Sequence, residues 1–278
     1  MKTLDIAPEL KGALKRLKLG HLIDVLPQRL TLAEQQGMSF DELLLLLLSD
    51  EISRRDSTAA LRRATDGGLD PDMVLERWDK TAKVSFDRRV LNELASLRFV
   101  DAARNVVVLG PVGVGKTFLA NALGHVACRN GYRVLFRRAD EMLKALRQSR
   151  FDNSRDVVML ELCTVDLLII DDFALEPMDR DESRDVYQLF VERSGRAATI
   201  VTSNRDTAEW IGAFADVLQA QSAVDRFINA AYDLVVEGES YRPRLKPSVN
   251  DADPPPPQPV AKSPRPIRRP SPHKRRAR

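Results

Sequence analysis

The chain has 278 residues, and 44% of them are hydrophobic, which suits one domain of ordinary size and a smaller one. Its longest apolar run, Leu43 to Leu48, is far shorter than the ~18 residues that cross a membrane, so we expect no membrane span. The first residues lack the apolar segment of a secretory signal, and the two cysteines, Cys128 and Cys163, suit a reducing cytoplasm, where we expect the protein. The three histidines are His21, His125 and His273. They lie far apart in the sequence, with no cysteine or carboxylate at metal-ligand spacing, which argues against a protein-ligated zinc site.

Charge is distributed unevenly along the chain, whose formal net charge is +3. The segment from Asp251 to Arg278 contains eight basic and two acidic residues, so the preceding part is close to neutral and any nucleic-acid contact there needs a local basic patch. The same segment is rich in proline and cannot bury a core. We therefore predict a disordered, basic tail over residues 248–278.

The N-terminal part, residues 1–85, shows helical periodicity and no strand signal. Apolar residues at helical spacing predict a first helix that includes Leu10, Leu14 and Leu17 and a second helix around residues 22–30. The capping box Ser39-Phe-Asp-Glu42 predicts that a longer helix starts at Ser39 and continues toward Arg63. Gly67-Gly68 should end it. We interpret this part as a helical domain that contacts DNA or a partner and supports assembly.

Residues 86–247 alternate strand and helix signals, which predicts an α/β domain. Strands separated by helices pair in parallel, with right-handed crossovers and helices on both faces of the sheet. Ligands of such sheets bind at the carboxyl ends of the strands. The expected strands are 105–109, 132–136, 165–170, 198–202 and 234–237, with helices at 118–127 and from a cap at Asp140 through Leu146.

The segment between the first of these strands and its helix matches G-x-x-x-x-G-K-[ST] from Gly110 to Thr117. Glycines let several backbone N–H groups point at one anion, and the helix N-terminus adds partial positive charge. Lys116 can reach the β- and γ-phosphates of a nucleotide, and the Thr117 hydroxyl can hold Mg²⁺. The predicted nucleotide contacts are Gly110, Pro111, Val112, Gly113, Val114, Gly115, Lys116, Thr117 and Phe118.

Two acids end the strand at 165–170, next to the predicted phosphate site. Asp171 is placed to hold Mg²⁺ through its waters, and Asp172 would face the γ-phosphate and polarise the attacking water. By themselves, two such aspartates are also typical of a turn or a helix cap.

Two further polar residues are candidates for the same site. Asn204 follows the strand at 198–202, where it would bond the γ-phosphate or the lytic water, or cap a helix that begins near Thr207. Arg226 would reach the nucleotide of a neighbouring subunit and stabilise transition-state charge, or pair at the surface with Asp225.

The order and spacing of these motifs resemble the IstB-like ATPases, helper proteins of insertion-sequence transposition that are related to the DnaC helicase loaders within the AAA+ class. The resemblance covers roughly residues 10 to 247. The segments that carry it are Gly110 to Thr117, Leu167 to Asp172, Thr202 to Asn204, Asp225-Arg226, Gly238 to Arg242, and in the first hundred residues Leu14 to Leu19, Glu42 to Leu46 and Leu94 to Phe99.

The resemblance implies an AAA+ core with strand order 5-1-4-3-2 over residues 86–247, preceded by the helical domain. It implies ATP and Mg²⁺ as cofactors, assembly of several copies on double-stranded DNA, and target selection for a partner transposase, with hydrolysis driving release. Lys116, Thr117 and Asp171 match the phosphate-loop and Walker B positions, and Asn204 matches sensor 1. Asp172 stands where the family commonly has glutamate, one methylene longer, which predicts slow hydrolysis. Arg226 is the candidate trans-acting finger, and Arg242 a basic residue near the nucleotide or the DNA.

Binding to DNA requires cationic side chains that face phosphates. No aromatic residues are interleaved with these cations to stack on single-stranded bases, so we expect contacts mainly to the DNA backbone, with little readout of sequence. Each candidate can also be a solvated helix face or a solubilising tail. The candidates form three groups, which are Lys11, Lys15, Arg16 and Lys18; Arg137, Arg138, Lys144, Arg147 and Arg150; and Arg268, Arg269, Lys274, Arg275, Arg276 and Arg278.

Three other functions share the phosphate loop. A helicase loader would use the same core with a hexameric helicase as partner. A small metabolite kinase would need an arginine-rich lid over the phosphates, which the sequence does not show. A scaffold would bind nucleotide without turnover, an alternative that Asp172 keeps open.

Overall fold

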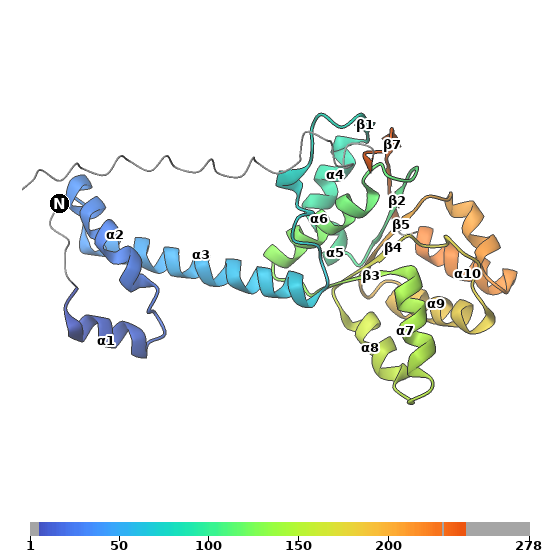
Figure 1. Cartoon of the computed structure of the whole chain (residues 1–278), viewed down its shortest axis with the longest axis horizontal. Helices are drawn as coiled ribbons and strands as arrows, with labels where there is room; N and C mark the ends of the chain where they lie inside the picture. Colours follow the sequence, from blue (N-terminus) through green and yellow to red (C-terminus); the bar gives the residue numbers. More distant parts are fainter. Residues whose placement is uncertain (1–5, 230, 243–278) are drawn as a thin grey trace, which may run out of the picture. The chain divides into compact units, whose positions relative to one another are not determined.

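The computed structural model of the chain describes residues 6–229 and 231–242, and the elements below belong to a compact unit that ends at Tyr241 (Figure 1). The predicted tail at 248–278 lies outside the described residues. Within the described ranges, no helix has the length and hydropathy needed to cross a membrane.

The N-terminal part is helical, as predicted, with α1 (Pro8–Arg16), α2 (Leu22–Gln36) and α3 (Phe40–Asp66). The capping box that begins α3 is present, since Ser39 Oγ accepts from the Glu42 N–H at 3.3 Å and the Glu42 carboxylate accepts from the Ser39 N–H at 2.7 Å. Ile6, Leu22, Leu26 and Leu47 form a small core of their own among these helices.

The end of α3 packs against the sheet domain. Gly67 ends the helix and approaches β3 (Val134–Arg138) closely, because its carbonyl accepts from the Phe136 N–H at 2.8 Å and a Cβ on it would lie 2.3 Å from the Val134 oxygen. Ala64 and Leu69 belong to the core of that domain. The glycine pair therefore ends the helix, as predicted, and also lets the chain contact the sheet. The domain boundary at residue 85 stays a prediction.

Five parallel strands form the central sheet in the order β3-β4-β5-β2-β6. Numbered from the first of the five, this is the predicted order 5-1-4-3-2 read from its other edge, so the predicted topology is confirmed. A second sheet, which the sequence did not predict, pairs β1 (Val84–Ser85) with β7 (Glu237–Gly238). The remaining strands are β2 (Asn105–Leu109), β4 (Leu167–Asp171), β5 (Ala198–Ser203) and β6 (Ala231–Val235).

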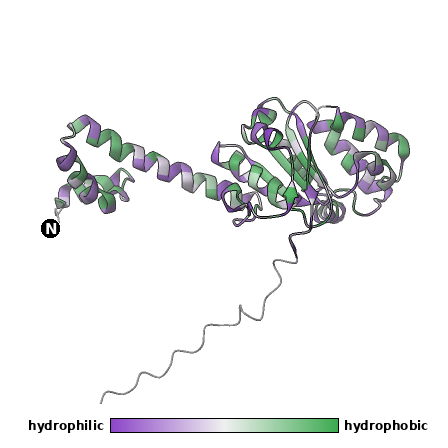
Figure 2. Cartoon of the chain, turned by 90° about the horizontal axis from the view of Figure 1, so that it is seen from above, coloured by the Kyte–Doolittle hydropathy of each residue, from purple (hydrophilic) through white to green (hydrophobic). Residues whose placement is uncertain are grey.

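The strands carry apolar side chains on both faces, because helices cover both (Figure 1). On β2, Val107 faces one core while Val106 and Val108 face the other. Figure 2 shows the hydrophobic strands between helices whose outer faces are hydrophilic. One face is covered by α4 (Arg88–Ala95), α5 (Arg98–Asp101) and α6 (Lys116–Arg129), and the other by α7 (Ala139–Ser149), α8 (Arg155–Thr164), α9 (Arg180–Arg193) and α10 (Val217–Ile228); short 3-10 helices are η1 (Leu75–Arg77) and η2 (Thr207–Ala213).

Four local predictions were wrong. The fifth strand of the sheet, expected at 234–237, is β6 at Ala231–Val235, and Glu237 belongs to β7 in the second sheet. The second strand starts at Val134 because Tyr132 belongs to the turn after α6, where its N–H donates to the Ala127 oxygen at 3.1 Å. Asp140 does not cap α7, since the N-cap is Arg138 and Asp140 lies in the first turn. Helix α8 was missed because its apolar residues do not form one stripe; Met159 and Leu162 are buried, whereas Val157 and Leu160 are exposed.

A buried arginine joins the second face of the sheet to its helices. Arg193, at the end of α9, is 2% exposed and faces backbone carbonyls and a hydroxyl rather than a carboxylate. Its guanidinium donates to Leu162 O at 2.8 Å, Val165 O at 3.0 Å, Ala198 O and Thr199 Oγ1 at 2.8 Å. Burial lowers the pKa of this guanidinium to about 10. One side chain therefore satisfies the groups where α8 ends and where β5 begins.

Replacing this arginine with methionine should destabilise the fold. Arg193→Met keeps the chain length but leaves several buried carbonyls without donors, so we expect the free energy of unfolding to fall by about 3 kcal/mol. Arg196→Met is the matched control, because Arg196 is 74% exposed and forms an ion pair with the exposed Glu192, and it should change stability by less than ~0.5 kcal/mol. Urea denaturation measures both, and equal effects would contradict the role given to Arg193.

Candidate nucleotide-binding site

The predicted phosphate loop lies at the carboxyl end of β2, with α6 starting at Lys116. Its glycines adopt positive φ, which is 153° at Gly110, 85° at Gly113 and 100° at Gly115. A Cβ on Gly110 would lie 2.0 Å from the Val236 oxygen, and one on Gly113 would lie 2.1 Å from Ser240 Oγ. The segment after β6 therefore packs against the loop and allows only glycine at these positions.

Lys116 is buried within this loop. Its Nζ donates to the carbonyls of Gly110 and Pro111, both at 2.8 Å. The ammonium group is thus held by the loop at the N-terminus of α6, where helix geometry already favours an anion. This is the position from which a lysine can contact nucleotide phosphates.

Asp171, at the end of β4, is buried beside the same loop. Its carboxylate accepts from Thr117 Oγ1 at 2.9 and 3.0 Å and from Thr202 Oγ1 at 2.6 Å. Burial raises the pKa of Asp171, and the two hydroxyl hydrogen bonds oppose that rise. Thr202 lies in the segment Thr202 to Asn204 that carries the family resemblance, but no sequence pattern predicted a role for it in this site.

The donor set of Thr117 and Asp171 fits Mg²⁺, which prefers oxygen ligands and keeps several waters. In the described part of the chain, no group of three or more His, Cys, Asp or Glu side chains is arranged to hold a metal. A cation here would therefore complete its coordination with phosphate oxygens and water, as expected where the nucleotide brings the metal.

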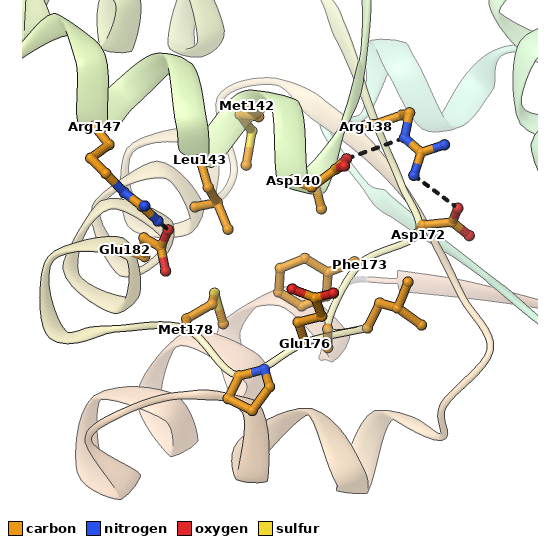
Figure 3. Close-up of a pocket in the computed structure, with 14 residues that line it drawn as sticks. Arg138, Asp140, Met142, Leu143, Arg147, Asp172, Phe173, Glu176, Met178 and Glu182 are labelled. Atoms are coloured by element: carbon orange, nitrogen blue, oxygen red, sulfur yellow. Dashed lines mark hydrogen bonds and ion pairs between the residues drawn. The ribbon is translucent and has the colours of Figure 1, made fainter.

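Asp172 lies at the edge of a cavity of 290 Å³ between α7 and the segment after β4 (Figure 3). Its backbone is left-handed, with φ 55°, and its carboxylate is half-exposed. Arg138 Nη2 lies 4.0 Å from Asp172 Oδ2, and Arg138 Nε donates to Asp140 at 3.1 Å. Arg138, which the sequence predicted to contact DNA, therefore lies beside Asp172, the acid predicted to orient the attacking water.

A second cavity, of 110 Å³, adjoins the phosphate loop and is lined mainly by aromatic and apolar groups. The Trp78 and Phe118 rings meet edge to face at 5.3 Å, and a Cβ on Gly115 would lie 2.9 Å from the Trp78 ring. Flat aromatic walls beside a phosphate site suit a nucleotide base. The sequence predicted Phe118 as a nucleotide contact but did not predict that Trp78 and Tyr241 line the same cavity. The only sequence signal for these two residues is that each is a large aromatic residue in a connecting segment.

Comparison with known proteins now decides the family. The profile of the family described as IstB-like ATP binding protein matches residues 12–248. The chain belongs to this family. A protein named for ATP binding in an insertion sequence of Mycobacterium tuberculosis is 36% identical over 241 residues, which cover 86% of this chain and 96% of that protein. A protein named for ATP binding in insertion sequence IS21 of Pseudomonas aeruginosa is 35% identical over 238 residues, which cover 86% of this chain and 90% of that protein.

Solved structures confirm the AAA+ fold. The crystal structure of DnaI has a TM-score of 0.51 at 21% identity, covering 59% of this chain and 90% of that chain. The replication initiator DnaA, bound to AMPPCP and single-stranded DNA, has a TM-score of 0.50 at 24% identity, covering 62% and 51%. At these identities the likeness concerns the fold alone.

In this IstB-like protein, Asn204 follows β5, which lies between β4 and β2, so it shares the sheet edge with the phosphate loop. It does not cap the next helix, because Asp206 caps η2. Arg226 is exposed on α10, and no ion pair with Asp225 is seen among the described residues. Its role in a neighbouring copy stays a prediction.

The DNA candidates of the IstB-like protein differ in how they are engaged. Lys15, Arg16 and Lys18 are exposed on α1 and just after it. In the second group, Arg147 pairs with Glu182 (Figure 3), and Arg150 pairs with the buried Asp185 at 2.6 Å. The third group lies outside the described residues. A DNA role for Arg147 or Arg150 would therefore require an exchange of partners.

The aromatic cavity makes a prediction about nucleotide affinity. Trp78→Ala removes one wall, so we expect ATP to bind about tenfold more weakly, since stacking on an aromatic side chain contributes roughly 1–3 kcal/mol. Fluorescence titration with a labelled ATP measures this. Trp210→Phe is the control, since Trp210 is fully buried away from this cavity in the opposite core. Unchanged ATP affinity in Trp78→Ala would show that this cavity does not bind the base.

Proposed function

We propose that this IstB-like protein is a magnesium-dependent ATPase that assembles on double-stranded DNA and acts on the transposase of its insertion sequence. The observation that carries the proposal is the pair Thr117 and Asp171, in hydrogen-bond contact at the mouth of a glycine loop that already holds Lys116. Membership in the IstB-like family supports the nucleotide as ATP.

Each residue has a role in that reaction. The loop amides and Lys116 would bind the phosphates, and Thr117 and Asp171 would hold the cation, which would neutralise charge at the transferred phosphoryl group. Asp172 would orient the attacking water. In this structure its carboxylate faces Arg138, which would compete with the water for that carboxylate. Asn204 contacts the γ-phosphate or the water from β5. The shorter side chain of Asp172 favours slow turnover.

In this proposal a second copy completes the site with its Arg226, and the exposed position of Arg226 on α10 supports that role. A role in transposition is favoured over helicase loading by the insertion-sequence names of the relatives. The likeness to DnaI is one of fold and does not reverse that preference.

Removing Lys116 and Arg226 separates nucleotide binding from assembled catalysis. We expect Lys116→Ala to lose ATP binding, and Arg226→Ala to bind ATP normally while DNA-stimulated turnover falls at least ~100-fold, because a trans-acting arginine contributes roughly 10³–10⁵ in rate. ATPase assays with and without duplex DNA test both variants.

Mixing supplies the control for that experiment. Lys116→Ala still carries Arg226, so adding it to Arg226→Ala should restore part of the turnover. Full DNA-stimulated activity of Arg226→Ala alone would rule out the finger, and wild-type ATP binding without turnover would favour a scaffold.

Because we propose contacts to the DNA backbone, we expect the affinity for duplex DNA to fall steeply as the salt concentration rises. Replacing Lys15, Arg16 and Lys18 together with glutamine should weaken duplex binding at every sequence and reduce the slope of log affinity against log salt by about 3, since each phosphate contact contributes roughly 0.9. Fluorescence anisotropy at several salt concentrations measures the slope. The matched control replaces Arg62, Arg88 and Arg89, also exposed, and an equal loss there would show only a charge effect.

A further inference from the structure

We propose that Thr202 is a positioning residue, which sets the orientation of the Asp171 carboxylate and the backbone of Asp172 for the magnesium nucleotide. The inference rests on the proposed function and adds to it a residue that the motifs do not assign. Thr202 is fully buried at the end of β5, directly beside the end of β4.

The hydroxyl of Thr202 both donates and accepts a hydrogen bond. It donates to Asp171 Oδ1 at 2.6 Å and accepts from the Asp172 N–H at 3.0 Å. The Thr202 carbonyl accepts in turn from the Phe173 N–H at 2.9 Å. One residue of β5 therefore holds the last residue of the neighbouring strand and the two residues that follow it.

Thr117 cannot orient the carboxylate alone. Its Oγ1 lies 3.0 and 2.9 Å from the two Asp171 oxygens, so it does not select between them. Thr202 bonds Oδ1 only, and thereby fixes the rotation of the carboxylate. Side chains that hold a metal ligand in this way typically change metal affinity 10–100-fold when they are lost.

The Asp172 backbone also depends on this contact. Asp172 and Ala174 have φ of 55° and 56°, a left-handed conformation that side chains other than glycine adopt at a cost. Hydrogen bonds from the Asp172 and Phe173 amides to Thr202 hold the chain in that conformation. The direction of the Asp172 carboxylate is consequently set from β5, two residues before Asn204.

The adjacent hydroxyl offers a matched comparison. Ser203 points to the opposite face of the sheet, where its Oγ donates to the Phe173 oxygen at 2.9 Å and accepts from Trp210 Nε1 at 3.2 Å. It is as buried as Thr202 and holds the same turn, but it does not touch Asp171. If the two buried hydroxyls had only a structural role, removing either one should have the same effect on magnesium-dependent ATP binding.

The test compares ATP dissociation constants in magnesium with those in EDTA. We expect the magnesium-dependent gain in affinity to fall about 10- to 100-fold in Thr202→Val, which keeps the shape but loses the hydroxyl, with little change in EDTA. Thr202→Ser should retain the gain. Ser203→Ala should melt at a lower temperature than wild type and keep the gain.

Two results would overturn the inference, namely a wild-type ratio in Thr202→Val or an equal loss in Ser203→Ala. If Thr202→Val does not fold, Thr202→Ala removes the same hydroxyl without placing a methyl group against the carboxylate, and the same outcomes apply. Failure of wild-type protein to bind ATP more tightly with magnesium would instead overturn the proposed function itself.

Discussion

The burial of one carboxylate beside a glycine loop is the constraint on which the rest of the site depends. Asp171 is 3% exposed, and an ionised carboxylate in that position costs free energy unless donors surround it. The donors come from two other elements, Thr117 at the start of α6 and Thr202 at the end of β5. The site is therefore built by the parallel sheet, which brings three chain segments to one edge.

The glycine loop depends on distant residues in a similar way. Val236 and Ser240 lie where Gly110 and Gly113 would carry a Cβ, so the segment after β6 closes the loop from outside. Trp78 approaches Gly115 from the segment that follows the helical part. A single-residue change at these glycines would consequently disturb packing as well as the anion site.

Charged side chains near Asp172 lie between the candidate nucleotide site and residues that the sequence predicted to contact DNA. Arg138 lies between Asp140 and Asp172, and the cavity beyond them is lined by both acidic and basic groups (Figure 3). Ion pairs with Glu182 and Asp185 stabilise this part of the domain and occupy Arg147 and Arg150. In the IstB-like protein, exposed cations on α1 are accordingly better placed than these to meet phosphates.

Sequence alone determined the phosphate loop, the acids after the third core strand, the strand order through the family resemblance, and the start of α3, because each is encoded in a short local pattern. Tertiary structure decided which distant groups meet at the sheet edge: Thr202 on Asp171, Arg138 beside Asp172, and Trp78 against Gly115. No local pattern specifies such contacts, since they arise only when parallel strands separated by helices align in register. The same physical reason made α8 hard to foresee, because burial of its residues is set by neighbours rather than by its own periodicity.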